Sequence, residues 1–194
     1  NADCWTVGGA MIVGDGVGTN DAKFDGKDSD CSFGGFVLYA DGAYIATSTT
    51  TYITANYNGY VWQNQSAGAS TFSHNNGKVV FDINTNTHSD VREDTFYDVE
   101  IDMNGSGYNL RFRDVTLNSV VFLGDLTITT GRFDDNVNTD TIDIHGTTYI
   151  GANGSFGTAS SWHSGVITHH GPVVLESSGN FYAGGGTYHY INSF

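Results

Sequence analysis

The sequence is poor in positive charge and in long apolar runs. Seven Lys and Arg residues stand against 21 Asp and Glu residues in a chain of 194, which gives a formal net charge of −14. A surface of this sign repels nucleic acid and anionic membranes, so neither is expected as a partner. No apolar run approaches the roughly 18 residues that a membrane-spanning helix needs, so membrane insertion is not expected either.

Proline and cysteine are scarce, whereas glycine and the residues typical of β-strands are common. One Pro and 26 Gly accompany many Asn, Asp, Thr, Val, Ile, Phe and Tyr residues, a composition that favours short strands joined by tight turns. The two cysteines, Cys4 and Cys31, form an even set without any Cys-x-x-Cys motif. We expect one disulfide bridge between them in an oxidising compartment, with two unpaired thiols as the alternative.

Apolar and polar residues alternate with a period of two in many short segments, which predicts half-buried strands. No segment longer than ten residues has convincing helical spacing. The residues predicted to face inward are Val79, Phe81, Ile83, Tyr97, Val99, Ile101, Val115, Leu117, Leu126, Ile128, Ile142, Ile144, Val173, Leu175, Tyr188 and Tyr190. Those predicted to face outward are Asp82, Asp98, Glu100, Thr116, Thr127 and Asp143.

Three segments share the order aromatic residue, polar turn and alternating strand. "FSHNNGKVVF" (Phe72–Phe81) aligns with "FYAGGGTYHY" (Phe181–Tyr190), and "GRFDDNVNTDTIDI" (Gly131–Ile144) is a looser third copy. Internal repeats of short strands are typical of a β-solenoid, in which each coil stacks on the last. A β-sandwich is the alternative, because it also needs several short alternating strands.

The regularity of the chain differs between its two parts. Residues 1–70 are less regular and are interpreted as an N-terminal capping segment, whereas residues 71–194 hold the repeats. A cap of this kind covers an otherwise open strand edge. No linker marks a boundary, so we predict one continuous all-β domain: a β-solenoid with an irregular N-terminal cap.

The repeats are similar in style to those of a known group of proteins. "TFSHNNGKVVFD", "DTFYDVEID" and "DVTLNSVVFLGDLTITTGRFDDN" resemble repeats of large secreted, cell-surface and virion β-solenoid proteins of the adhesin, fibre or filament type. Asp98 and Val99 stand where that pattern has Asn and Leu. The resemblance covers roughly residues 70–194, and 34–62 more weakly. It implies an architecture and an extracellular or virion-surface location, but no reaction.

The sequence ends inside a repeat. "GGGTYHYINSF" closes at Phe194, where the pattern continues with a strand of the kind "YDVEI". Two expectations follow: the chain is a fragment of a longer protein, or its open coil pairs with a second copy. Head-to-tail repetition of that contact gives a filament. Copies of the chain itself are therefore the expected partner.

Two sets of oxygen-bearing side chains are candidate calcium sites. Oxygen ligands at alternate positions, as in the first set, are able to wrap a hard cation such as Ca²⁺, although the first set does not have the pattern of an EF-hand. The alternative interpretation is a solvated acidic turn between strands. The first set is Asp134, Asn136, Asn138 and Asp140, and the second is Asp25, Asp28 and Asp30.

Signals for an enzyme or a transition-metal site are weak. The adjacent His169 and His170 are expected to point to opposite faces of a strand and not to share a metal. No His-Glu-x-x-His motif, Gly-x-Ser-x-Gly elbow or phosphate loop is present. Arg111 and Arg113 are explained by cross-strand ion pairs with Asp98 and Glu100. We therefore expect no enzymatic activity.

Aromatic residues in Gly-, Asn- and Ser-rich turns and three sequons point towards glycans. The aromatic residues are Trp5, Trp62, Trp162, Tyr57, Tyr60 and Tyr182, and the favoured interpretation is that they cap coil ends or fill subunit contacts. The sequons begin at Asn64, Asn104 and Asn153. The sequence thus predicts a structural protein of an extracellular or virion-surface filament, fibre or coat. The alternative is a carbohydrate-binding or carbohydrate-cleaving β-solenoid module.

Overall fold

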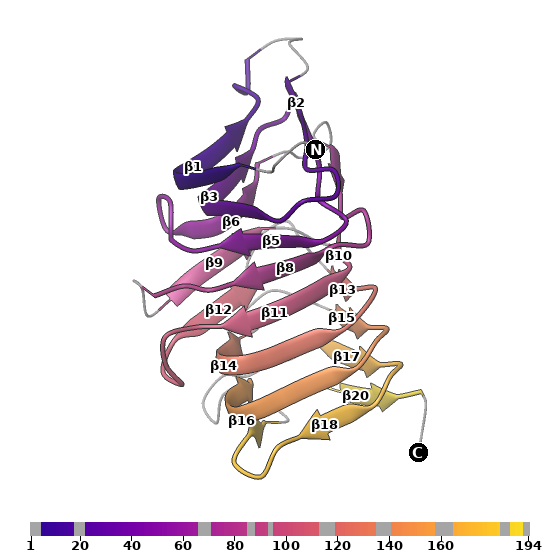
Figure 1. Cartoon of the computed structure of the whole chain (residues 1–194). Coiled ribbons are helices and arrows are strands. Elements are labelled where there is room, and N and C mark those ends of the chain that lie inside the picture. The colour runs from indigo at the N-terminus through magenta and orange to yellow at the C-terminus, as the bar shows by residue number, and fades with distance from the viewer. Residues whose placement is uncertain are drawn as a thin grey trace.

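The chain forms a parallel β-solenoid of about six turns (Figure 1). The computed structural model describes residues 5–17, 22–65, 71–84, 88–92, 95–112, 119–134, 141–157, 165–182 and 187–191. These residues are all-β without a helix, and every pairing between their strands is parallel. The predicted solenoid is therefore confirmed, and the β-sandwich alternative is wrong.

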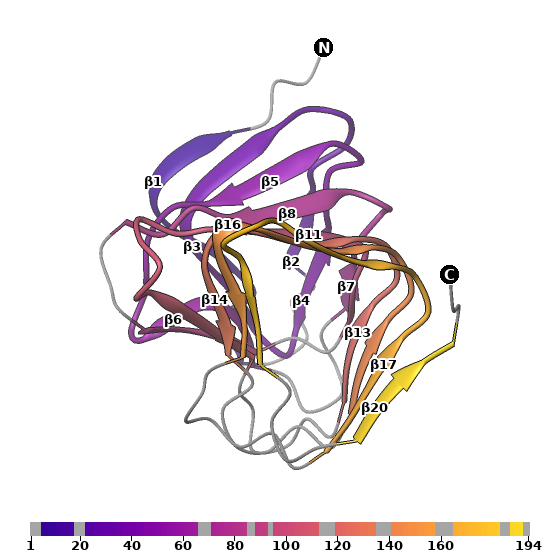
Figure 2. The same cartoon turned by 90° about the horizontal axis from the view of Figure 1, so that it is seen from below.

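Each coil passes over three faces, which Figure 2 shows by looking along the stack. The first face holds β5 (Thr50–Ile53), β8 (Lys78–Phe81), β11 (Asp98–Asp102) and β18 (Val173–Leu175). The second holds β6 (Tyr60–Asn64), β9 (His88–Arg92), β12 (Asn109–Phe112) and β19 (Asn180–Phe181). Four long strands run across both of these faces: β1 (Thr6–Val13), β3 (Cys31–Leu38), β14 (Leu126–Asp134) and β16 (Thr148–Phe156).

The third face consists of two parallel sheets. One contains β2 (Ala22–Asp25), β4 (Gly42–Ile45) and β7 (Thr71–Ser73). The other contains β10 (Thr95–Phe96), β13 (Ser119–Phe122), β15 (Thr141–Ile144), β17 (Val166–His169) and β20 (Thr187–Tyr190). Since parallel pairing places equivalent residues above one another, a side chain on this face meets its counterpart from the neighbouring coil.

Glycine makes the bend in the long strands possible. Gly154 lies directly after the register irregularity between Ile150 and Asn153 of β16, where the strand passes from the first face to the second. A Cβ atom at this position would lie 2.2 Å from the carbonyl oxygen of Ile128 in the coil above. Only a residue without a side chain allows the two backbones to approach this closely.

Stacked aromatic rings fill the interior of the solenoid. The rings of Phe112, Phe133, Phe156 and Phe181 follow one another from coil to coil, with centroids 4.9 to 5.4 Å apart. Phe36 and Trp62 continue the interior in the earlier coils, with centroids 4.4 Å apart. Ring pairs at these separations contribute about 0.5–1.5 kcal/mol each beyond the burial of their area.

Alternation predicted the inward face well in the middle of the stack and less well at its lower end. Val79, Phe81, Val99, Leu126 and Ile142 belong to the described inward residues that are buried as predicted. The exceptions are Tyr97, which stacks on His74 outside the core, and Leu175 and Tyr190, which are exposed. Val173 and Tyr188 are half-buried against the core. Val115, Thr116 and Leu117 lie outside the described residues.

The predicted repeat alignment pairs segments from different faces. Phe181 belongs to β19 on the second face, in register with Phe156, whereas Phe72 belongs to β7 on the third face, in register with Tyr44. Phe72 and Phe181 are therefore not equivalent, and that alignment is wrong. The looser copy, Gly131–Ile144, is equivalent to the Phe181–Tyr190 segment, because Phe133 occupies the same ring stack as Phe181. The error arose because any aromatic residue followed by a polar turn satisfies the pattern, whichever corner it precedes.

Parallel pairing continues across residue 70. β4 pairs with β7 and β5 pairs with β8, so strands before and after this position belong to the same sheets. β3 and β6 extend the first and second faces upward in the same manner. The segment interpreted as a cap thus contributes complete coils to the solenoid.

Candidate functional site

A repeated corner after the third face places two histidines above one another. His145 and Gly146 follow β15, and His170 and Gly171 follow β17 in the next coil. The backbone N–H of His145 donates to Phe122 O at 2.8 Å, and that of His170 donates to Ile144 O at the same distance. These bonds fix the two histidines in register on neighbouring strands.

The glycine after each histidine keeps the two corners close. A Cβ atom on Gly171 would lie 2.2 Å from the carbonyl oxygen of Gly146. A larger residue would force the corners apart and would separate the histidine side chains that precede them.

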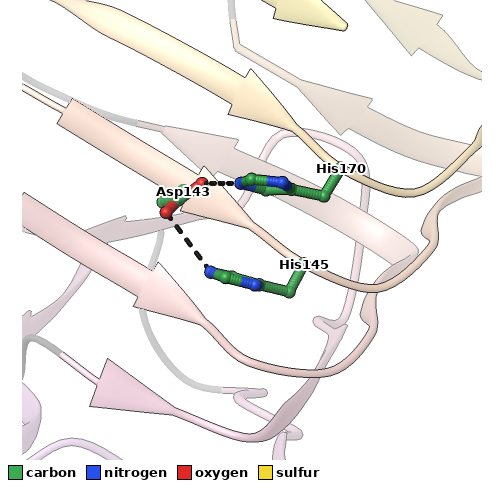
Figure 3. A group of neighbouring side chains, drawn as sticks. All are labelled: Asp143, His145 and His170. Atoms are coloured by element: carbon green, nitrogen blue, oxygen red, sulfur yellow. Dashed lines mark hydrogen bonds and ion pairs between the residues drawn. The ribbon is translucent and has the colours of Figure 1, made fainter. Parts of the chain in front are cut away.

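The two imidazoles converge on one carboxylate, as Figure 3 shows. Asp143 Oδ1 lies 2.7 Å from His170 Nε2, and Asp143 Oδ2 lies 3.3 Å from His145 Nε2. The rings of His145 and His170 stack with centroids 4.4 Å apart and 16° between their planes. One ligand atom from each of the three side chains lies within 4.8 Å of the other two.

The cluster of Asp143, His145 and His170 lies on the outer surface of the solenoid. The side chains of Asp143, His145 and His170 are 37%, 43% and 30% exposed, respectively. Asp143 occupies the outward position of β15 between the buried Ile142 and Ile144. This is the only group of three His, Cys, Asp or Glu side chains with metal-binding spacing within the described part of the chain.

His169 points the opposite way from His170, as the alternation of a strand predicts. It is fully buried, and its Nδ1 lies 3.0 Å from Thr148 Oγ1. Burial lowers the pKa of His169 to about 4 because the charged imidazolium loses its hydration there. His169 is therefore a neutral residue of the core, stacked on Tyr190.

Sequence reasoning missed the cluster, although a signal for it exists. Aligning "TIDIHG" (141–146) with "VITHHG" (166–171) places His145 over His170, which is the register of the structure. The histidine pair singled out from the sequence is adjacent along the chain, whereas the pair that meets lies on neighbouring coils. The shared His-Gly corner is the feature that identifies the pair.

The calcium candidates are described only in part. Asp25 accepts a hydrogen bond from Lys27 N, Asp28 from Ser48 Oγ and Asp30 from Thr50 N, so each carboxylate has a different partner. The described part of the chain does not gather these three carboxylates into a group of metal-binding spacing. Asp134 is buried and accepts a hydrogen bond from Asn109 Nδ2. The remaining members of the first set, Asn136, Asn138 and Asp140, lie outside the described residues.

The disulfide and glycosylation candidates stay predictions. Cys31 is described, but Cys4 lies outside the described residues, so the Cys4–Cys31 bridge is not tested. Of the sequon asparagines, Asn104 and Asn153 are exposed, and Asn64 is half-buried at the end of β6.

Arg111 forms an ion pair with a different acid from the one predicted. Its Nε lies 2.6 Å from Asp90 Oδ1 of the neighbouring strand β9. Glu100, one of the two expected partners, pairs instead with Lys78 of β8. Arg113 lies outside the described residues. Arg111 thus forms a cross-strand ion pair as predicted, but with an acid of β9 and not with one of β11.

Most strands at the two ends of the stack are uncharged and expose apolar residues, the exception being β2 at the first end, which carries Lys23 and Asp25. No Asp, Glu, Lys or Arg occurs in β1 at one end or in β18, β19 and β20 at the other. Within the described residues, none of these strands pairs on its outer edge. The exposed apolar side chains are Trp5 and Ile12 at the first end, and Val174, Leu175, Tyr190 and Ile191 at the second.

A polar hollow of about 270 Å³ opens near the second face. Arg132 and Tyr182 contribute the large side chains of its lining, and no Asp or Glu takes part. The full lining is Ser106, Arg132, Ala152, Asn153, Gly154, Ser155, Asn180 and Tyr182.

Comparisons with known proteins identify no relative. No family model, no curated protein and no solved structure matches the chain. The described residues contain no helix, and thus no helix long and apolar enough to cross a membrane.

Proposed function

We propose that the protein is a structural, non-enzymatic building block of an extracellular or virion-surface assembly, in which copies join end to end. The repeat style of the sequence supports the location, and the exposed sequon asparagines Asn104 and Asn153 are consistent with it. The fold supports the proposed function, because a stack of parallel coils is rigid along its axis and is able to grow only at its two ends.

The observation that carries the proposal is the exposure of inward-facing positions in the last described strands, β18 and β20. Leu175 pairs in register with the buried Ile150, and Tyr190 pairs with the buried His169. Both therefore continue inward-facing columns, yet both are exposed because no described strand lies beneath them. Another coil placed there would bury these side chains and pair the open backbone edge.

A second copy is the occupant that the charge distribution favours. The chain carries a net charge of −14, so copies repel one another over most of their surfaces. Four of the five end strands, β1, β18, β19 and β20, carry no Asp, Glu, Lys or Arg, and they lack the charges that commonly protect an edge from pairing. The fifth, β2, carries Lys23 and Asp25. Contact of one end with the other is heterologous, so it propagates as a filament.

Sedimentation velocity over a wide range of protein concentration tests the proposal. We expect the wild-type chain to form a ladder of linear oligomers, and electron microscopy to show rods that lengthen in steps. Leu175→Lys combined with Tyr190→Lys should leave a folded monomer, since two lysines at the joint would have to be desolvated without partners.

Leu123→Lys is the matched control for this experiment. Leu123 is also an exposed leucine, but it lies at a lateral corner in the middle of the stack. This variant should assemble like the wild type. A wild-type chain that stays monomeric at every concentration, or equal loss of assembly in the control, would contradict end-to-end joining.

The polar hollow favours a second candidate function, carbohydrate binding. Tyr182 offers an aromatic surface beside the polar side chains of Asn153 and Asn180, a combination that suits a polar ligand. The lining lacks the two carboxylates that glycoside hydrolysis uses, so it supports binding and not cleavage. A glycan array probed with the wild type and with Tyr182→Ala tests this candidate: a glycan retained only by the wild type supports it, and an empty array contradicts it.

A further inference from the structure

We propose that Asp143, His145 and His170 bind one divalent transition-metal ion of the Zn²⁺ type on the outer surface of the third face. The proposal rests on the geometry of these three side chains. It is independent of end-to-end assembly, because the cluster lies at a lateral corner and not on an end strand.

The donor set determines the class of metal. Two imidazole nitrogens and one carboxylate oxygen suit Zn²⁺, Cu²⁺, Ni²⁺ or Co²⁺, whereas Ca²⁺ and Mg²⁺ require sites built from oxygen. Three protein ligands leave one position of a tetrahedral ion for water, as in zinc sites that keep an open coordination position.

The ligand atoms are already close to the spacing that a metal needs. Tetrahedral coordination at about 2.0–2.1 Å places neighbouring ligand atoms roughly 3.3 Å apart. One ligand atom from each of the three side chains lies within 4.8 Å of the other two. The two oxygens of the Asp143 carboxylate each face one ring, with Oδ1 2.7 Å from His170 Nε2 and Oδ2 3.3 Å from His145 Nε2. A tilt of the two rings, without movement of the strands, therefore closes the site around an ion.

The backbone holds the cluster ready for binding. Asp143 lies within β15, and the two histidines are fixed by the N–H bonds to Phe122 O and Ile144 O. Sites built on strands lose little freedom when a ligand binds, because their backbone positions are fixed before binding.

Local charge also favours a cation. Among the described residues, the ion-pair partners of Asp143 are the two imidazoles, and no Lys or Arg lies within ion-pair distance of its carboxylate. The net charge of −14 raises the local concentration of cations at the surface. A bound dication would satisfy the carboxylate and both Nε2 atoms together.

Metal titration of the whole chain tests the proposal. After removal of metals with a chelator, we would titrate the protein with Zn²⁺ by calorimetry and record the visible spectrum of bound Co²⁺. We expect one ion per chain and a tetrahedral Co²⁺ spectrum. Each of His145→Ala, His170→Ala and Asp143→Asn should weaken binding by at least about tenfold, because even an outer partner of a metal ligand contributes roughly 10- to 100-fold.

His74→Ala is the matched control, since it removes another outward imidazole that stacks on an aromatic ring, Tyr97, at a centroid distance of 5.6 Å. Its affinity should equal that of the wild type. Circular dichroism verifies that each variant is folded, and His145→Gln and His170→Gln replace any alanine variant that is not. Absence of 1:1 uptake, wild-type affinity in the His145 and His170 variants, or an equal loss in the His74 variant would overturn the assignment.

Discussion

Tyr44 Oη and Thr51 Oγ1 lie 3.1 Å apart inside the solenoid and form a hydrogen bond between two consecutive strands on different faces. Both residues are fully buried. The bond therefore ties β4 on the third face to β5 on the first face, across a corner of the coil.

Removing one partner of this bond should destabilise the protein. Tyr44→Phe leaves the buried Thr51 hydroxyl without its partner, which should lower the free energy of unfolding by about 1–2 kcal/mol. Thr51→Val in the Tyr44→Phe background removes the orphaned hydroxyl and should recover part of that loss. Urea unfolding of the wild type, both single variants and the double variant measures the coupling. Strictly additive losses would show that the bond contributes nothing of its own.

Alkaline pH should act on the same residue. Burial raises the pKa of Tyr44 to about 12, above the ordinary value of 10 that applies in the unfolded chain. A raised folded-state pKa contributes stability below pH 10 that is lost as the pH rises towards 12, because the unfolded state releases the proton first. In the Tyr44→Phe variant, the urea concentration at the midpoint of unfolding should therefore fall less over this pH range than in the wild type. An identical fall in the variant would assign the effect to other groups.

A methyl group at the bend of β16 should be poorly tolerated. Gly154→Ala places a Cβ atom 2.2 Å from the Ile128 carbonyl oxygen, so the backbone has to move. We expect a loss of about 1–3 kcal/mol in denaturant unfolding, the usual effect of overpacking. Gly107 has no heavy atom within 4 Å of an added Cβ, so Gly107→Ala should stay within about 0.5 kcal/mol of the wild type. Equal losses in the two variants would count against the close approach.

Truncation of a central ring should have the largest effect. Phe112 is almost fully buried, and its ring contacts those of Phe81, Phe96, Phe122 and Phe133. Phe112→Ala should lower the free energy of unfolding by about 3–5 kcal/mol. Tyr52→Ala, at an exposed outward position, should cost far less. A loss below about 1 kcal/mol for Phe112→Ala would mean that the core closes around the missing ring.

Alternation within one strand predicted much of the fold, because each strand is half-buried and its period is local. The inward positions Val79 and Val99 follow directly from it, and they pair in register on neighbouring strands. The register between coils was not predictable in the same way. Leu123, His145, His170 and Ile191 occupy corresponding corner positions, yet they are separated by 22, 25 and 21 residues. Unequal loops hide the repeat from an alignment with a fixed period.

The candidate site was missed for the same reason. Asp143 and His170 come together only when a complete coil separates them, and neither residue is unusual within its own strand. The exposure of Leu175 and Tyr190 was also not predictable, because alternation reports which face of the strand is apolar but not whether another coil covers it.

Because the coils stack in parallel, the number of coils determines the length of the molecule. Each coil adds one strand spacing of about 4.8 Å to the length and leaves the cross-section unchanged. Duplication or deletion of one coil, such as the segment from β14 to β15, would change the length of the protein by that fixed step. The side chains of the coils above and below would still stack on equivalent positions. A gene encoding this fold is thereby able to vary the length of its product in equal increments without building a new core.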